Sequence, residues 1–231
     1  LWTNQITDTT ATGGSIACDA SGNSYAIIEA SSISTLIAHD ASGNILIADS
    51  GNVRVRQVSN GNINTIVGTG VAGDSGDGGA ATNATMLDPT SVAVDSSGNI
   101  YVADFQATRV RKITNGTIST FAGTGTPGIS TDGSGAGASL LAFPESVATD
   151  STGNVFFSET GGFVNGTLVA SRVRKVSGGT ISTVAGLPGV AGFSGDGSAA
   201  SRLARRSPER SLGTKLVVAA PPHEREWIVT V

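Results

Sequence analysis

The chain of 231 residues is poor in several kinds of residue. It holds a single cysteine, Cys18, and two histidines, and only 14% of its residues are charged and 5% aromatic. One cysteine excludes an intrachain disulfide and a cysteine cluster for zinc, and Cys18 falls at a core-like strand position that indicates a buried, unreactive thiol. No apolar run approaches the ~20 residues that a membrane-spanning helix needs, so no membrane insertion is expected.

Positive charge is also scarce over most of the chain. Residues 1–201 carry 8 basic and 15 acidic side chains, whereas residues 202–231 carry 6 basic and 3 acidic ones. A protein that binds nucleic acid usually presents a basic patch. The acidic character of residues 1–201 therefore disfavours a nucleic-acid partner.

Glycine is abundant, with 32 residues, and Ser, Thr, Asn and Asp cluster between short apolar runs. This pattern is typical of many short strands joined by tight turns. One block recurs every 55 residues: Asp-x-x-Gly-Asn followed by a short apolar run, beginning at Asp40, Asp95 and Asp150. A fixed period with matched turn residues indicates a repeat architecture.

Each complete repeat contains four expected strands, which in the second repeat span residues 92–95, 99–104, 108–113 and 117–122. We call them a to d. Asn-Gly or Gly-Gly pairs separate strands c and d in all three repeats, and such pairs supply the positive φ angles of two-residue hairpins. Four antiparallel strands cannot bury two faces alone, so the repeats must stack. We therefore predict an all-β fold, a partial β-propeller with about three full blades and a half blade.

The period divides the chain into segments. They are a leader or the end of a preceding blade (1–14), a degenerate half blade (15–39), three blades (40–94, 95–149 and 150–201) and a tail outside the repeat (202–231). Asp40 follows Asp19 by only 21 residues, so this unit is degenerate or has suffered a deletion. The tail is either a frameshift or truncation scar or a terminal capping segment. Open sheet edges in such a fragment predict self-association.

The second repeat carries a family likeness. Its sequence from Pro89 to Asp104, followed by Arg-Val-Arg-Lys-Ile at 109–113, resembles the NHL repeat, in the bacterial form with Gly-rich Ser-Gly-Asp-Gly-Gly linkers between blades. The resemblance implies a propeller that binds proteins, ligands or RNA, often outside the cell, and a few relatives are lyases or lactonase-like hydrolases. We therefore expect an extracellular or periplasmic protein, although no signal peptide is visible.

Acidic residues that recur in every blade are interpreted as structural. The pairs Asp49/Arg54, Asp104/Arg109 and Glu159/Arg172 lie at the ends of strands b and c and are plausible cross-strand partners. Asp40, Asp95 and Asp150 are expected to form turns rather than to act as paired acid and base. No catalytic residue is assigned.

No cofactor or metal is predicted either. The segments Asp74–Gly79 and Ser194–Gly197 resemble acidic metal loops but lack the bidentate Glu that ends an EF-hand loop. Gly68-Thr-Gly lacks the ending of a phosphate-binding P-loop. His39, on an inner strand, and His223, in the tail, cannot form the three-His set of a catalytic zinc site.

Function is sought where the repeats differ. Alternating strand directions place the b–c and d–a loops on one face, and the third b–c loop, residues 161–171, is eight residues longer than its counterparts. Loops on a rigid scaffold often carry function, and an exposed apolar loop suggests a contact surface. The alternative is a β-ribbon that packs on its own blade. The candidate ligand-binding residues are, in this loop and in the acidic linker, Phe163, Val164, Leu168, Asp74 and Asp77.

The sequence thus favours a non-enzymatic scaffold that binds a protein, peptide or glycan through this loop face. The alternative is a propeller enzyme of the lyase or lactonase type with a metal in its channel.

Overall fold

The structure is a computed structural model. It describes residues 42–162 and 171–186 with their side chains. Outside these ranges it describes the backbone of short strands at 11–13, 16–18, 24–26, 29–30, 37–39, 163–164, 167–169, 215–218 and 227–230.

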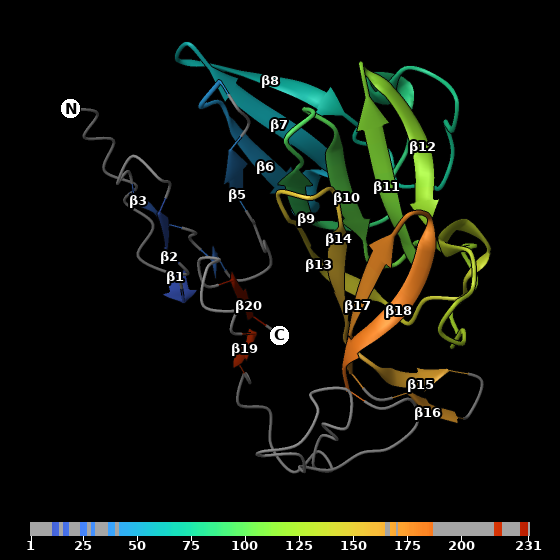
Figure 1. The fold of residues 1–231 in the computed structure, drawn as a ribbon. Coiled ribbons are helices and arrows are strands. Elements are labelled where there is room, and N and C mark those ends of the chain that lie inside the picture. Colours follow the sequence, from blue (N-terminus) through green and yellow to red (C-terminus); the bar gives the residue numbers. More distant parts are fainter. Residues whose placement is uncertain are drawn as a thin grey trace.

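Three antiparallel four-stranded sheets form the body of the described chain (Figure 1). In each sheet the strands follow one another in chain order as a meander, which confirms the prediction of four-stranded blades. The first sheet contains β5 (Ile37–His39), β6 (Ile45–Asp49), β7 (Arg54–Ser59) and β8 (Asn62–Val67). The second contains β9 (Pro89–Val94), β10 (Ile100–Asp104), β11 (Arg109–Thr114) and β12 (Thr117–Ala122). The third contains β13 (Pro144–Thr149), β14 (Val155–Glu159), β17 (Arg172–Ser177) and β18 (Thr180–Ala185).

The repeat boundaries at Asp40, Asp95 and Asp150 fall between the first and second strands of a sheet. Asp95 forms the turn there as predicted, because its carboxylate accepts bonds from the backbone N–H groups of Ser97 and Asn99, both at 2.9 Å. Burial raises the pKa of Asp95, but the bonds from Asn99 and Tyr101 outweigh it and hold the pKa below its ordinary value. Asp150 makes the same turn in the third sheet.

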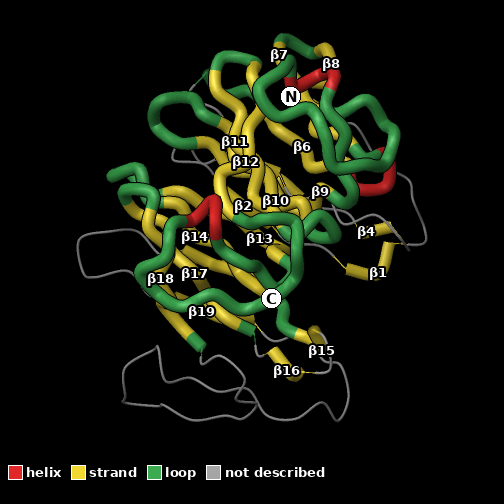
Figure 2. The backbone as a smooth tube through the Cα atoms, turned by 90° about the vertical axis from the view of Figure 1, so that its right-hand side faces the viewer, coloured by secondary structure: helices red, strands yellow, loops and turns green. Residues whose placement is uncertain are grey.

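The sheets pack face to face and bury two apolar layers. Leu46, Met86 and Ile118 lie in the layer between the first and second sheets. Tyr101 and Phe157 lie in the layer between the second and third. Figure 2 shows the same succession of sheets from the side. Because each sheet buries apolar side chains against a neighbouring sheet, stability comes from stacking rather than from any single blade.

The inner strands β9 and β13 run side by side with their repeat positions aligned. The Thr90 hydroxyl donates to the Glu145 carbonyl oxygen at 2.6 Å, and the Thr149 hydroxyl donates to the Val94 carbonyl oxygen at 2.7 Å. Both pairs are 55 residues apart. Side chains therefore satisfy the inner strand edges where no ladder of backbone bonds exists.

Smaller elements complete the described chain. Short 3₁₀ turns lie in the loops, as η1 (Ser50–Asn52), η2 (Ala81–Asn83) and η3 (Ala136–Ala138). Two-stranded pairs are β1 (Ala11–Gly13) with β4 (Glu29–Ala30), β2 (Ile16–Cys18) with β3 (Ser24–Ala26), β15 (Gly162–Val164) with β16 (Thr167–Val169), and β19 (Lys215–Val218) with β20 (Trp227–Thr230). The side chains of Cys18, His39 and His223 lie outside the described residues. In the part of the chain that is described, no helix has the length and apolar character to cross a membrane.

Candidate functional site

The linkers between sheets extend beyond the loop face where the sequence places them. The first linker, residues 68–88, ends beside Asp104 on that face, but its middle lies along the outer strand β12. Gly78 N–H donates to the Ile118 carbonyl oxygen at 2.8 Å, and Ile118 N–H donates to the Gly79 carbonyl oxygen at 3.0 Å. The linker thus adds a short fifth strand and covers an edge that would otherwise be open.

The second linker covers β18 in the same way. Gly133 N–H donates to the Ile181 carbonyl oxygen at 2.9 Å, and Ile181 N–H donates to the Ser134 carbonyl oxygen at 3.0 Å. The position equivalent to Ile118 is Ile181, and both side chains are fully buried. Edge coverage by the preceding linker is therefore a property of the repeat.

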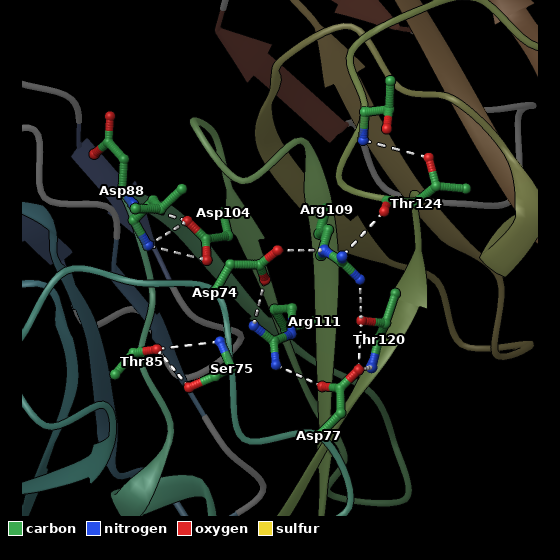
Figure 3. Close-up of polar contacts among 12 residues, drawn as sticks. Asp74, Ser75, Asp77, Thr85, Asp88, Asp104, Arg109, Arg111, Thr120 and Thr124 are labelled. Carbon is green, nitrogen blue, oxygen red and sulfur yellow. Dashed lines mark hydrogen bonds and ion pairs between the residues drawn. The ribbon is translucent and has the colours of Figure 1, made fainter.

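An aspartate fixes each linker to the blade that it covers, and Figure 3 shows the one in the first linker, Asp77. The Asp77 carboxylate accepts bonds from the backbone N–H and the hydroxyl of Thr120, at 3.0 and 2.6 Å, and pairs with Arg111. Burial raises the pKa of Asp77, but the bonds from Thr120 and Arg111 together bring it below its ordinary value. Asp132 in the second linker contacts Thr183 and Arg174 in the same arrangement.

Asp74 pairs with two arginines of the second sheet. Its carboxylate lies 3.0 Å from Arg109 Nε and 3.5 Å from Arg111 Nη1 (Figure 3). Arg111 is only 1% exposed, so its charge depends on these acidic partners. Asp74 and Asp77, two of the candidate ligand-binding residues, are thus already engaged within the chain.

The predicted acid–arginine pairs face each other in register at the ends of strands b and c in all three sheets. Among the described residues only Glu159 forms the expected ion pair, at 2.5 Å from Arg172 Nη2, and its Oε2 also lies 3.6 Å from Arg174 Nη1. Asp104 instead accepts bonds from linker N–H groups, including that of Asp88 at 2.7 Å. The aspartate side chain is shorter than that of Glu159, and its carboxylate binds the linker backbone instead of the arginine. Burial raises the pKa of Asp104 to about 6.

In the third sheet one glutamate takes the place of two aspartates that serve the second sheet. Ile129 occupies the position of Asp74, so that linker provides no carboxylate for the first arginine. Glu159 Oε1 accepts the N–H of Ala142 at 2.8 Å while Oε2 contacts the arginines. One glutamate therefore performs the tasks that Asp104 and Asp74 share in the second sheet.

The loop face differs between the two sheet junctions. At the first junction the Ser50 hydroxyl donates to the Asp88 carboxylate at 2.6 Å. At the second junction the equivalent residues are Phe105 and Phe143, whose ring centroids lie 5.4 Å apart at an interplanar angle of 34°. Both rings are partly exposed, and Phe143 packs against Ala142 with Ile129. A polar contact of the repeat is thus replaced by an aromatic one.

Phe143 also has an unusual backbone, with φ of 55°. Positive φ is a genuine outlier for a bulky residue, and such strain is found preferentially at functional sites. The equivalent Asp88 does not share it. This pair was not predicted, although the sequence has two phenylalanines at the repeat positions of Ser50 and Asp88.

The insertion at 161–171 begins beside this aromatic pair. Thr160 N–H donates to the Phe143 carbonyl oxygen at 3.2 Å, and the Ser171 hydroxyl donates to the Thr160 carbonyl oxygen at 2.6 Å. The insertion forms the β15–β16 ribbon, in which Phe163 pairs with Leu168 and Val164 with Thr167 (Figure 1). The insertion is thus a ribbon, as the alternative interpretation expected. Its packing on the blade stays a prediction, because the side chains of Phe163, Val164 and Leu168 lie outside the described residues.

Glu145 completes the site. It follows Pro144 at an irregularity in the pairing of β13 with β14, where such bulges re-aim a side chain. Its carboxylate makes no hydrogen bond or ion pair with any residue that the structure describes, and burial raises its pKa. We call Phe105, Phe143, Glu145 and the β15–β16 ribbon the aromatic rim.

Comparison with protein families identifies the repeat. Residues 61–130 match the family profile of the teneurin NHL domain. Over this segment the repeat is similar to an NHL domain. The matched segment includes the whole second sheet with the first linker, and it confirms the NHL likeness that the sequence suggested.

Solved structures support the fold. The chain is similar to a protein of unknown function from Bacteroides thetaiotaomicron, with 22% sequence identity over 84% of this chain and 49% of that chain and a TM-score of 0.54. A weaker likeness is to a chain of a nidogen/laminin complex, with 13% identity over 70% of this chain and 52% of that chain and a TM-score of 0.45. Another is to a gluconolactonase from Xanthomonas campestris, with 14% identity over 70% of this chain and 50% of that chain and a TM-score of 0.44. The chain spans about half the length of these proteins. At 22% identity the likeness to the Bacteroides protein bears on the fold and not on function.

Proposed function

We propose that the protein is a non-enzymatic NHL scaffold that binds a protein, peptide or glycan ligand on its b–c and d–a loop face, at the aromatic rim. The observation that carries the proposal is the local departure from the repeat. Two partly exposed phenylalanines replace a polar pair beside an eight-residue insertion. We also propose an extracellular or periplasmic location, as the NHL likeness implies.

The chemistry of the rim suits recognition. Aromatic residues are enriched in protein interfaces, where they provide large contact areas at low entropic cost. The two rings are held by stacked sheets, so little ordering is needed on binding. Glu145 adds a partly buried carboxylate that lacks a described partner and that a donor group on a ligand would satisfy.

The alternative is a propeller enzyme of the lyase or lactonase type with a metal in its channel. Within the described residues no three His, Cys, Asp or Glu side chains lie together as metal ligands. Metal analysis of the purified protein tests this alternative directly. A stoichiometric tightly bound metal would favour the lyase or lactonase type.

The binding proposal is tested by shortening the insertion. Deleting residues 162–169 restores the five-residue step between the strand b acid and the strand c arginine that the first two blades have. A displayed random peptide library and a glycan array are probed with both forms. We expect ligands that the full chain retains and the shortened chain loses, and Phe143→Asp should lose them too. Retention by both altered forms, with intact folding by circular dichroism, would refute the proposal.

A further inference from the structure

Among the described residues, none covers the outer strand of the first sheet as the linkers cover those of the other two sheets. Ile63 of β8 occupies the position of Ile118 and Ile181, which are fully buried, yet it is 53% exposed. The cause is visible in the sequence, because only 21 residues separate Asp19 from Asp40 where a full repeat has 55. The unit before the first sheet is therefore too short to supply a linker of the usual kind.

Arg56, the arginine that would pair with an aspartate of such a linker, also has no partner among the described residues. Arg56 occupies the position of Arg111 and Arg174, which pair with Asp77 and Asp132. No described residue forms an ion pair or hydrogen bond with Arg56, and its Nε is buried without a partner. Arg111 Nε also lacks a partner, so the two arginines differ in the carboxylate that Arg111 has and that Arg56 lacks among the described residues, and Arg56 is therefore free to receive one.

The receptor has three parts in the order in which a linker would meet them. Arg56 would receive the aspartate side chain, Thr65 holds the place of Thr120, and Ile63 presents backbone groups at the outer edge of β8. In the second sheet the equivalent groups bind Asp77, Gly78 and Gly79. The open edge of β8 thus presents the groups that bind an Asp-Gly sequence, and it is not simply an apolar surface.

We propose that the segment Ser194-Gly-Asp196-Gly197 of a second copy of this chain docks on β8. It repeats the Ser75-Gly-Asp77-Gly78 sequence of the first linker. Residues 202–231 do not continue it with another repeat, so the chain carries one linker motif without a following blade and one blade without a preceding linker. Asp196 accepts bonds from Thr65 and pairs with Arg56, and Gly197 N–H donates to the Ile63 carbonyl oxygen.

This contact joins different surfaces of the two copies. Such a heterologous contact forms rings or open chains rather than a symmetric pair. Each copy keeps its aromatic rim on the loop face, so the proposal is independent of the ligand-binding function proposed above. Docking of the segment within its own chain would produce no association and would contradict the proposal.

Charge reversal tests the contact. Sedimentation velocity over a range of concentrations should show that the wild-type chain associates, and Arg56→Asp and Asp196→Arg should each weaken association by about tenfold or more, as expected for loss of a close charge pair. The double variant should regain association. An equimolar mixture of the two single variants should also associate, because each variant presents a surface that complements one on the other.

Control variants separate docking from folding. Gln106→Asp adds a negative charge at an exposed loop position and should leave association unchanged. Ile63→Lys blocks edge pairing without touching Arg56 and should abolish association while the circular dichroism spectrum is retained. A wild-type chain that stays monomeric at every concentration, or association that ignores all of these substitutions, would overturn the proposal.

Discussion

The exchange of Asp74 and Asp104 for Ile129 and Glu159 predicts a strong energetic coupling between positions 129 and 159. Glu159→Asp shortens the side chain by one methylene, about 1.5 Å. The carboxylate then cannot hold both the Ala142 N–H and the arginines, which lie at 2.5 and 3.6 Å in the wild type. Arg172 and Arg174 are 3% and 0% exposed, so water cannot replace the lost partner.

The size of the effect follows from this burial. Removing one partner of a buried ion pair costs roughly 3–5 kcal/mol. Because aspartate keeps a charge near the arginines, we expect Glu159→Asp to lower the free energy of unfolding by about 2–3 kcal/mol. Ile129→Asp alone should also destabilise, since it places a second carboxylate beside Glu159 and removes the apolar packing of Ile129 against Ala142. Together the two changes recreate the arrangement of the second sheet, and we expect a coupling of about 2 kcal/mol.

Urea denaturation of the wild type, both single variants and the double variant measures the coupling. Glu159→Gln serves as a control that keeps the length and an oxygen that accepts the Ala142 N–H but removes the charge, so in this background Ile129→Asp should restore only the carboxylate that pairs with the arginines. Coincident unfolding curves from circular dichroism and tryptophan fluorescence are needed before free energies are compared. Additive effects of the two substitutions, within about 0.5 kcal/mol, would refute the reasoning.

Three further predictions concern stability. The pKa of Asp104 is raised to about 6 in the folded chain, so the folded state binds its proton more tightly than the unfolded state, where the pKa is near 4. The stability that this proton adds is present at low pH and is lost as the pH rises from about 4 through about 6. Relative to Asp104→Asn, the wild type should lose about 2 kcal/mol of unfolding free energy between about pH 4 and about pH 7. Gly123→Ala should cost about 3 kcal/mol because φ is 95° and the new Cβ would strike a backbone carbonyl oxygen, whereas Gly98→Ala, with φ of 80° and open space, should cost about 1 kcal/mol by thermal melting. Tyr101→Phe should cost about 1 kcal/mol by removing a hydroxyl that donates to a turn aspartate, and Phe156→Tyr, at the equivalent position, should gain up to about 1 kcal/mol by creating it.

The regular part of the fold could be predicted from the sequence because the repeat makes each local signal appear three times. The Asp-x-x-Gly-Asn turns, the Asn-Gly hairpins and the facing acid–arginine positions all occur where the period places them. Local turn chemistry and strand alternation determine these features. Recurrence also indicated that they are structural.

The path of the linkers could not be predicted in this way. Glycine-rich segments have weak local preferences, so the pairing of Gly78 with Ile118 depends on the neighbouring sheet. For the same reason the sequence suggested a ligand role for Asp74 and Asp77, whose arginine partners lie more than thirty residues away in the next repeat. The aromatic rim was missed because its two phenylalanines come from different repeats and meet only when the sheets stack.

The central claim is that each linker serves as a fifth strand for the next blade and that β8 alone lacks one among the three described sheets. Amide hydrogen exchange at the equivalent residues Ile63, Ile118 and Ile181 tests it most directly. In dilute protein we expect strong protection at Ile118 and Ile181 and rapid exchange at Ile63, with protection of Ile63 increasing at concentrations where the chain associates. Equal protection of all three amides in a dilute monomer, or rapid exchange at Ile118, would contradict the account.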